Sequence, residues 1–380
     1  MVGLGACTAP PDETGAAPAA ASDSARVAEV THAIVVVLDG ARLEETLGDG
    51  DGDLTGAPVA DQLPSVREVL LPQGLLVRPG FSTGVTVTGP AHNALTTGAR
   101  STVFNLPLTT APGFYVSDFP TFLERASAAG LPGAMLANTG HVLPVAYSAW
   151  PDLGVRTGVT ASVVWRGDDE TNGFGTDREV LDAVWSAVHD EGKHAVVANL
   201  HDVDRAGHDG AEGEYPAAIR DLDEALVALW RNLQAWEATR DRTMLVITAD
   251  HGRHATDWTS AWRAHGDECA GCRELPMLIL APGLEPGTSD SPWALEDVGA
   301  TVAAALGLDL SSADGTPIDA FADRLPGTAS RGPAWVTSSG GRRGTLELTG
   351  TPTGRAAFAV DGVALSSSSA TLVAAPRLVS

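Results

Sequence analysis

Acidic residues and histidines follow three apolar segments of this chain, each near the place where a buried strand would end. Asp39 follows IVVVL, Asp204 and His208 lie in the loop expected after AVVANL, and Asp250 and His251 come after MLVIT. Taken singly, such residues are usually turn formers, helix caps or surface groups. Ligands of parallel α/β sheets bind beyond the carboxyl ends of the strands, so the coincidence predicts one shared site. Asp and His ligands without cysteine suit a hydrolytic metal site, with Zn²⁺ the first expectation.

Two further residues could complete such a site. His265 lies in the segment RAHGD ahead of the next apolar run, where an isolated histidine is otherwise a surface or loop residue. Thr88 begins the run Thr-Gly-Pro, and Pro90 suits the first position of a helix, where its missing N–H is no loss. Thr88 is therefore either an ordinary N-cap or a hydroxyl placed where free helix N–H groups favour negative charge. With the strand-end residues, the set is large enough for two divalent ions.

The elements that would position these residues alternate between strand and helix. Apolar runs predict buried strands of the parallel type at 32–40, 75–80, 133–138, 194–200, 243–252 and 276–283. Helical spacing of apolar residues predicts helices at 63–74, 117–130, 176–188 and 215–239. The third helix begins with a capping box formed by Thr176 and Glu179. This order predicts an α/β/α sandwich around a mostly parallel sheet.

The composition describes a folded chain with a strong negative charge. Its 380 residues are 44% hydrophobic, which supports a substantial core in one large α/β domain or in two domains. The net charge of −24 argues against a nucleic-acid polymer as a partner, because such binding requires clustered Lys and Arg. Lys193 is the only lysine, so an anionic substrate would meet arginine or a metal pair.

The two ends of the chain differ in composition from its middle. Residues 8–30 are rich in Pro, Ala and Ser and resemble a flexible tether, whereas short Gly/Ser/Thr-rich β segments begin at about residue 326. We therefore expect a tether over 1–30, a main α/β domain over 31–325 and a small β-rich extension over 326–380.

The tether begins with Leu-Gly-Ala-Cys, which ends at Cys7 and resembles a bacterial lipoprotein lipobox, although the usual charged and apolar stretch before it is missing. No apolar run is long enough to cross a membrane. A lipid anchor at Cys7 would make this an extracytoplasmic protein at the cell surface or in the periplasm. The alternative is that the lipobox match is due to chance.

Cys269 and Cys272 form an isolated C-x-x-C pair. Without a second pair it is a weak indication of a zinc site, and without thioredoxin-like surroundings it is a weak indication of a redox motif. In an oxidising compartment a local disulfide is the simplest interpretation.

The order of these motifs resembles the alkaline phosphatase superfamily, and most closely its nucleotide pyrophosphatase/phosphodiesterase branch. That family begins with a strand ending in an aspartate, matched by VVVLDG, and continues with T-x-P-x-H…T-G, matched by TGPAHNALTTG from Thr88. Its D-x-x-G-H and D-H-G motifs are matched by DRAGH from Asp204 and by DHG from Asp250. A final histidine has His265 as its candidate. The matches extend from residue 32 to about 310, and several weak motifs in one order make the resemblance specific.

The resemblance implies an α/β/α metal-dependent hydrolase of phosphate esters with two divalent ions, Zn²⁺ being the first expectation. One ion would be held by Asp204, His208 and His265, with His254 as the alternative to His265. The second would be held by a set made of Asp39, Thr88, Asp250 and His251.

Thr88 would also be the nucleophile and form a phosphothreonyl intermediate. Asn105 is the loose counterpart of the family's phosphate-contacting asparagine, although it lies closer to Thr88 than the family spacing. Arginines that could contact an anion, or could be simple surface charges, are Arg42, Arg100, Arg205 and Arg253. The substrate would be a small phosphate ester, and the sequence leaves open which one, whether it is a monoester or a diester, and the oligomeric state.

Four alternatives remain open within and outside this family. A sulfatase would need a cysteine or serine where Thr88 stands, and a phosphonate hydrolase would share the metal core. A phosphomutase shares the strand-end motifs but carries a dedicated substrate domain, and only about 75 residues separate Thr97 from the helix at 176. A surface-anchored binding lipoprotein with a degraded site would be expected to have lost some ligands, whereas here the set is complete.

Overall fold

The computed structural model describes residues 29–322, apart from 53–57, 79, 101–118, 149–158, 168–172, 211–212, 255–260 and 311–312. Five short strands are described beyond them: β12 (Val336–Thr337), β13 (Leu346–Gly350), β14 (Ala356–Val360), β15 (Val363–Leu365) and β16 (Leu372–Val373). Cys7 and nearly all of the expected tether lie outside the described residues, so the tether, the lipid anchor and the domain boundaries stay predictions. Within the described part, no helix is both long and apolar enough to cross a membrane.

A sheet of eight strands runs through the centre of the α/β part, in the order β10-β2-β9-β7-β1-β6-β4-β5. The strands, in chain order, are β1 (His32–Leu38), β2 (Leu75–Val77), β4 (Gly133–Ala137), β5 (Val159–Val163), β6 (Ala195–Leu200), β7 (Thr243–Thr248), β9 (Met277–Leu280) and β10 (Gly287–Ser289). All pair in parallel except β9, which runs antiparallel to both neighbours. The predicted α/β fold with a mostly parallel sheet is confirmed, whereas the parallel direction expected for the strand at 276–283 is wrong.

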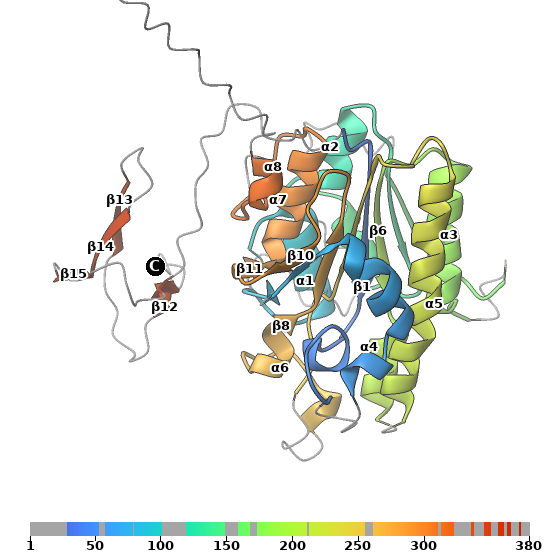
Figure 1. Cartoon of the computed structure of the whole chain (residues 1–380), viewed down its shortest axis with the longest axis horizontal. Helices are drawn as coiled ribbons and strands as arrows, with labels where there is room; N and C mark the ends of the chain where they lie inside the picture. Colours follow the sequence, from blue (N-terminus) through green and yellow to red (C-terminus); the bar gives the residue numbers. More distant parts are fainter. Residues whose placement is uncertain are drawn as a thin grey trace, which may run out of the picture.

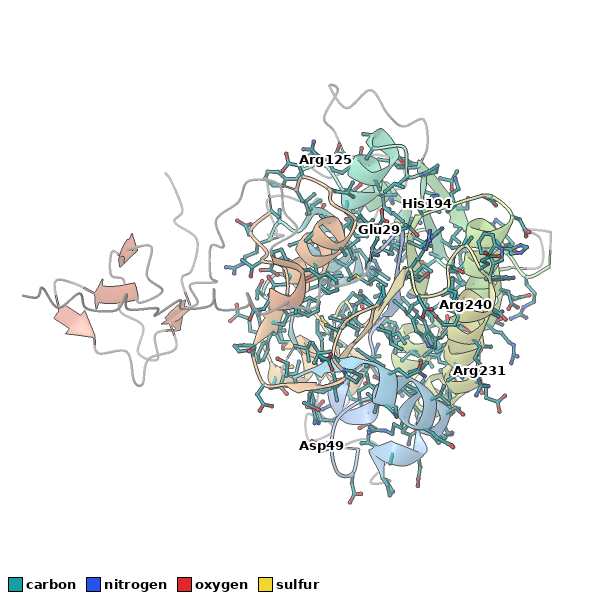
Figure 2. The ribbon with its side chains drawn as sticks, turned by 45° about the horizontal axis from the view of Figure 1, so that its top comes forward. Glu29, Asp49, Arg125, His194, Arg231 and Arg240 are labelled. Atoms are coloured by element: carbon teal, nitrogen blue, oxygen red, sulfur yellow. The ribbon has the colours of Figure 1, made fainter. Side chains whose placement is uncertain are left out.

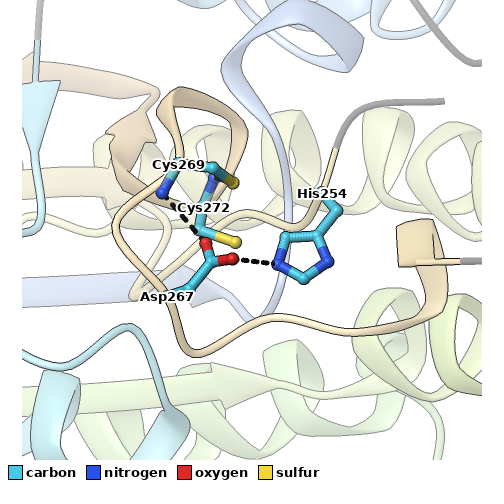
Figure 3. A group of neighbouring side chains, drawn as sticks. All are labelled: His254, Asp267, Cys269 and Cys272. Carbon is cyan, nitrogen blue, oxygen red and sulfur yellow. Dashed lines mark hydrogen bonds and ion pairs between the residues drawn. The ribbon is translucent and has the colours of Figure 1, made fainter. Parts of the chain in front are cut away.

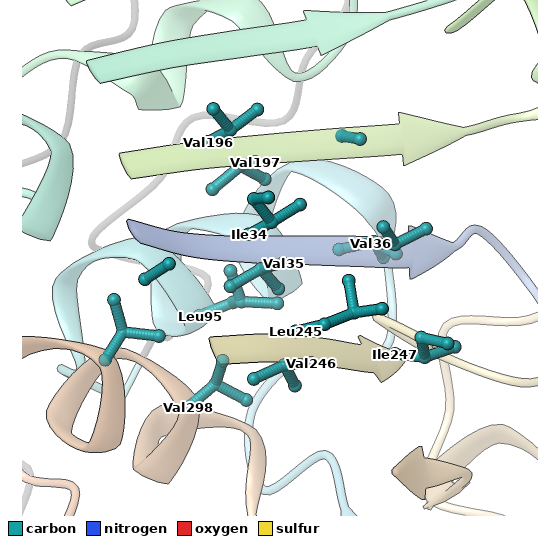
Figure 4. Packing of buried hydrophobic residues seen from close by; sticks show 14 of the residues in the cluster. Ile34, Val35, Val36, Leu95, Val196, Val197, Leu245, Val246, Ile247 and Val298 are labelled. Atoms are coloured by element: carbon teal, nitrogen blue, oxygen red, sulfur yellow. The ribbon is translucent and has the colours of Figure 1, made fainter. Parts of the chain in front are cut away.

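Strand β1 lies in the middle of this sheet and pairs in parallel with β6 on one side and with β7 on the other. Its β-branched residues are completely buried, and Figure 4 shows Ile34, Val35 and Val36 between side chains of the two neighbouring strands. Strands covered on both faces need such continuous apolar runs. The residue that follows β1 is therefore held at the carboxyl edge of the most buried part of the sheet.

Helices cover both faces of the sheet (Figure 1). One layer contains α3 (Asp177–His189), α4 (Asp202–Asp209) and α5 (Glu214–Ala235), and the other contains α1 (Thr88–Thr97), α2 (Phe122–Ala128), α7 (Leu295–Ala305) and α8 (Asp319–Ala322). A smaller sheet of β3 (Gly80–Phe81), β8 (Glu274–Leu275) and β11 (Trp293–Ala294) lies beside the main one. The three layers form the expected α/β/α sandwich.

The predicted start of α3 is confirmed, because the Thr176 side chain accepts from the Glu179 N–H while the Glu179 side chain accepts from the Thr176 N–H. The helix expected at 63–74 differs in detail. It consists of a π-type turn (Val66–Leu70) followed by a 3-10 turn (Leu71–Gln73) that contains Pro72. Proline removes a main-chain donor, so a regular α-helix cannot continue there.

Charged side chains lie at the outside of the molecule. Asp49, Arg231 and Arg240 are exposed, and Asp49 projects from the edge of the ribbon in Figure 2. The charged residues that are buried include Asp39, Asp204, Asp250 and Arg253, which lie at the carboxyl edge of the central strands. Burying charge without a partner is costly, so this group needs a specific explanation.

Candidate metal centre

Asp39 follows β1 directly and is completely buried. One carboxylate oxygen, Oδ1, lies 3.4 Å from the Thr88 hydroxyl and 3.4 Å from Nε2 of His251. The other, Oδ2, accepts hydrogen bonds from Asn199 at 2.9 Å and from His201 at 3.0 Å. Asp39 is thus oriented through Oδ2, which leaves Oδ1 directed toward Thr88 and His251.

Gly40 allows a close approach beside Asp39. Its φ of +69° is a left-handed conformation, and a Cβ there would lie 2.5 Å from Oδ1 of Asp204. Its N–H donates to Oδ1 of Asp250 at 3.2 Å. The Asp-Gly pair therefore brings the main chain after β1 against the two other carboxylates, and a larger residue would separate them.

Asp204 and His208 lie on helix α4 and not in the loop that the sequence suggested. Residues four apart are neighbours on one helical face, and Nε2 of His208 lies 3.3 Å from Oδ2 of Asp204. His265 comes from a distant segment, and its Nε2 lies 3.7 Å from Oδ1 of Asp204 and 3.0 Å from Nε2 of His208. The three residues expected to hold one ion are brought together.

Asp250 and His251 follow β7, the strand on the other side of β1. Oδ1 of Asp250 accepts from the N–H of His251 at 2.9 Å as well as from Gly40. Oδ2 of Asp250 lies 3.5 Å from Nε2 of His251, and it has no hydrogen-bond partner among the described residues. A buried carboxylate oxygen without a hydrogen-bond donor is suited to binding a cation.

Thr88 is the first residue of α1, and Val87 is the N-cap, with no side-chain capping bond. The helix therefore begins two residues before Pro90, and the alternative in which Thr88 is the N-cap is wrong. Proline is tolerated here because the N–H groups of the first turn have no intrahelical acceptor. Freed from capping, the Thr88 hydroxyl lies 3.3 Å from Nε2 of His251, beside Asp39.

In three histidines of this site, a hydrogen bond to a main-chain carbonyl determines which ring nitrogen carries the hydrogen. Nδ1 of His251 donates to the carbonyl of Gly252, Nδ1 of His265 to that of Thr86, and Nδ1 of His92 to that of Thr88, each at 2.9 Å. A carbonyl oxygen only accepts, so Nδ1 carries the hydrogen and Nε2 remains as a ligand atom. This arrangement is the usual outer support of metal-binding histidines.

The electrostatic environment keeps Asp204 and His265 in the states that bind metal. Burial alone would raise the pKa of Asp204, but the hydrogen bond from His208 and the nearby His251 and Arg253 hold it well below its usual range. Burial and the neighbouring His251 lower the pKa of His265 to about 4. A carboxylate and a neutral imidazole are the forms that bind metal.

Two residues of this site, His92 and His201, were not predicted from the sequence. His92 lies one turn after Thr88, is completely buried, and places Nδ1 3.4 Å from Oδ2 of Asp250. His201, just before α4, donates to Asp39; burial opposes its charge, but the hydrogen bond to Asp39 and the surrounding carboxylates raise its pKa to about 9. The T-x-P-x-H spacing could have indicated His92, whereas nothing in the sequence separates His201 from an ordinary loop histidine.

The described side chains fit a metal-binding centre. Two groups have ligand atoms within 4.8 Å of one another, one made of Asp204, His208 and His265 and the other of Asp39, Asp204 and His251. They share Asp204, and Thr88 and Asp250 adjoin the second group. Carboxylate and imidazole donors of this kind suit Zn²⁺ and related divalent ions.

Residues 170–310 match the family model described as the Metalloenzyme superfamily. The chain is also 30% identical over 214 residues to a phosphopentomutase of Anaeromyxobacter sp. (strain K), which covers 53% of this chain and 46% of that protein. The matched part of this chain spans 46% and 40% of the lengths of the first two curated relatives.

Two solved structures share the fold. The lipoteichoic acid synthase LtaP from Listeria monocytogenes superposes with a TM-score of 0.55 at 14% identity, covering 78% of this chain and 77% of that chain. The murine ectonucleotide pyrophosphatase/phosphodiesterase 5 superposes with a TM-score of 0.54 at 12% identity, covering 75% of this chain and 97% of that chain. Residues 170–310 are therefore similar to the Metalloenzyme superfamily, and the chain shares the fold of these two solved structures. The nucleotide pyrophosphatase/phosphodiesterase branch stays a prediction, since the Anaeromyxobacter relative is a phosphopentomutase.

Arg253 is buried and forms an ion pair with Asp204, so it is not the simple surface charge considered from the sequence. Its guanidinium passes over Gly207, where a Cβ would lie 2.1 Å from Cζ of Arg253. The glycine between Asp204 and His208 is thus explained by close packing. Arg205 pairs with Asp202 at the surface.

Asn105 lies outside the described residues, so its expected contact with phosphate stays a prediction. His254, the alternative to His265, does not join the group around Asp204; it lies 2.8 Å from Asp267 in a separate cluster. The structure therefore favours His265 for the position beside Asp204 and His208.

Proposed function

We propose that this protein is a metalloenzyme that hydrolyses small phosphate esters, with Thr88 as the nucleophile. The observation that carries the proposal is the position of the Thr88 hydroxyl at the start of α1, beside the buried carboxylate of Asp39 and Nε2 of His251, which belong to one group of potential metal ligands. The proposed ligand sets are those expected from the sequence, Asp204, His208 and His265 for one ion and Asp39, Asp250, His251 and Thr88 for the other.

The bound ions would polarise the phosphoryl oxygens and favour the ionised form of the Thr88 hydroxyl. Asp39 and His251 orient that hydroxyl from 3.4 Å and 3.3 Å. The Thr88 hydroxyl gives up its proton to solvent and its oxygen forms the new P–O bond, while the ester oxygen leaves with the bonding electrons and takes a proton from solvent. The positive end of α1 lies where negative charge gathers. Water then attacks the phosphothreonine, releases phosphate and restores the hydroxyl.

The first experiment compares the zinc-loaded protein on p-nitrophenyl phosphate and on bis-p-nitrophenyl phosphate. Faster cleavage of the diester supports a phosphodiesterase, and faster cleavage of the monoester supports a phosphatase. Acid quenching followed by mass spectrometry should find one phosphoryl group on the peptide that contains Thr88. Release of p-nitrophenol from neither compound, together with no phosphorylated peptide, would contradict the proposal.

A phosphomutase is the second candidate, because the Anaeromyxobacter relative is a phosphopentomutase. A mutase returns the phosphoryl group to a sugar hydroxyl, whereas a hydrolase delivers it to water. Incubation with a pentose phosphate, followed by assays of both isomerised sugar phosphate and inorganic phosphate, separates the two.

A further inference from the structure

A second cluster of metal-binding side chains lies in the segment that connects β7 to β8. It consists of His254, Asp267, Cys269 and Cys272, which we call the loop cluster. Each residue offers a ligand atom, and these atoms all lie within 4.8 Å of one another. Figure 3 shows the four side chains facing a common space. None of them belongs to the two groups around Asp204.

The two cysteines are free thiols in the structure, so the local disulfide expected from the sequence is not present. Cys269 is the N-cap of the short helix α6 (Ala270–Arg273), and its Sγ accepts from the N–H of Cys272 at 3.3 Å. A main-chain N–H that donates to sulfur stabilises the thiolate form, which is the form that binds metal. The tight turn thus presents both sulfurs to the same space.

The other two members approach from outside this turn. Oδ2 of Asp267 lies 2.8 Å from Nε2 of His254, and Oδ1 accepts from the N–H of Cys269 at 2.9 Å. Cys272 is buried, whereas the Asp267 side chain is 47% exposed, so a cation can enter from solvent on the Asp267 side. Two thiolates, one imidazole and one carboxylate form a set that suits tetrahedral Zn²⁺.

We propose that the loop cluster binds one structural zinc ion. Its position links it to the catalytic region. The hydroxyl of Thr86 donates to the carbonyl of Asp267 at 2.8 Å, and the carbonyl of Thr86 accepts from His265 at 2.9 Å. The N–H of Gly252, next to His251, donates to the carbonyl of Cys272 at 2.9 Å. An ion in the loop cluster therefore holds both ends of the segment that carries His251 and His265.

Cobalt substitution tests the site without relying on activity. The reduced, metal-free full chain is loaded with Co²⁺, and the near-ultraviolet absorption that arises from thiolate-to-cobalt charge transfer is measured. The groups around Asp204 contain no cysteine, so they cannot produce this band. We expect the band in the wild-type protein, its loss in the Cys269→Ser/Cys272→Ser variant, and one equivalent of bound metal fewer per chain in that variant.

Two matched variants complete the test. Cys7→Ser should keep the band, which shows that the remaining cysteine does not supply the thiolate. The pair Asp204→Asn/His208→Ala should also keep it while losing metal from the proposed catalytic site, so failure of the two proposals can be distinguished. The proposal is overturned if the reduced wild-type protein shows no thiolate-cobalt band, or if the band survives replacement of both Cys269 and Cys272.

Discussion

Asp204 is the residue on which the proposed centre depends most. It contributes to both groups of ligand atoms, pairs with Arg253 and lies beside Gly40. The sequence indicated it as a ligand, but its shared position follows only from the meeting of α4 with the ends of β1 and β7. A residue with this many close partners tolerates little movement of its neighbours.

Replacing Thr88 with alanine should lower turnover on the order of 10³-fold or more, because it removes the proposed nucleophile. Metal content should change little, since the carboxylates and imidazoles remain. Steady-state kinetics and metal analysis of the purified variant measure both effects.

Thr96→Ala is the matched control, because Thr96 is a buried threonine of the same helix whose hydroxyl donates to Val145 O at 3.2 Å. It should lose some stability and keep most of its activity. Near-full turnover in Thr88→Ala would assign the nucleophile elsewhere.

Replacing Gly207 with alanine should displace Arg253, because the new Cβ would overlap its guanidinium. We expect a loss of about 1–3 kcal/mol in the free energy of unfolding, as for other overpacked sites, together with weaker metal binding through Asp204. Gly213→Ala is the control, since a Cβ there meets nothing within 4 Å. Denaturant titrations of the two variants should differ clearly, and equal stabilities would count against the packing argument.

Among the elements, α3 and α4 secure each other at their N-termini. The carboxylate of Asp177 accepts from the N–H of Asp202 at 3.0 Å, and the carboxylate of Asp202 accepts from the N–H of Asp177 at 3.0 Å. Asn138, after β4, donates to both side chains. This buried network holds the ligand-bearing helix α4 against α3 and the sheet.

The network predicts a specific pH dependence. Burial and the charge of Asp202 raise the pKa of Asp177 to about 7, above its ordinary value of 3.8. Between these values the folded protein holds a proton that the unfolded chain has lost, so this group's contribution to stability falls as pH rises from about 4 to about 7. Asp177→Asn does not titrate, so it should gain stability relative to wild type over this range.

Urea denaturation at several pH values measures this difference. Asp182→Asn, at an exposed position of the same helix, is the control and should follow the wild-type curve. A difference between Asp177→Asn and wild type that stays constant from pH 4 to pH 7 would rule out titration of Asp177 in this window.

The outline of the fold was predictable from local pattern, because buried strands need continuous apolar runs and α3 carries its capping box in consecutive residues. The helix α4 was not predictable in this way, because its sequence DVDRAGHD has few apolar residues. Its position depends on the Asp177–Asp202 network. The direction of β9 was also missed, because a strand buried on both faces has the same pattern in either direction. The ligand residues could be named from their motifs, whereas the contacts of Gly207 and His201 arise only in three dimensions.

At the scale of the whole molecule, metal binding should contribute to stability. Without ions, the carboxylates of Asp39, Asp204 and Asp250 lie buried near one another, and a ligand that binds only the folded state stabilises it. Zinc at 100-fold above its Kd should add about 2.7 kcal/mol to the free energy of unfolding for each site. EDTA should reverse the accompanying rise in Tm.

Thermal unfolding with zinc and with EDTA provides the measurement. The Cys269→Ser/Cys272→Ser variant serves as the background in which only the proposed catalytic ions remain. Identical Tm values in zinc and EDTA in that background would show that the carboxylate centre does not bind the metal.

The neighbouring strands β7, β1 and β6 carry Asp250, Asp39 and the helix that holds Asp204. The lateral spacing of Asp39 and Asp250 follows from the main-chain pairing of β1 with β7 at about 4.8 Å, whereas Asp204 is placed by α4. During evolution, loops that carry no ligand residue can change in length and sequence without moving Asp39 and Asp250. Substrate preference can therefore differ among related proteins while these carboxylates keep their positions.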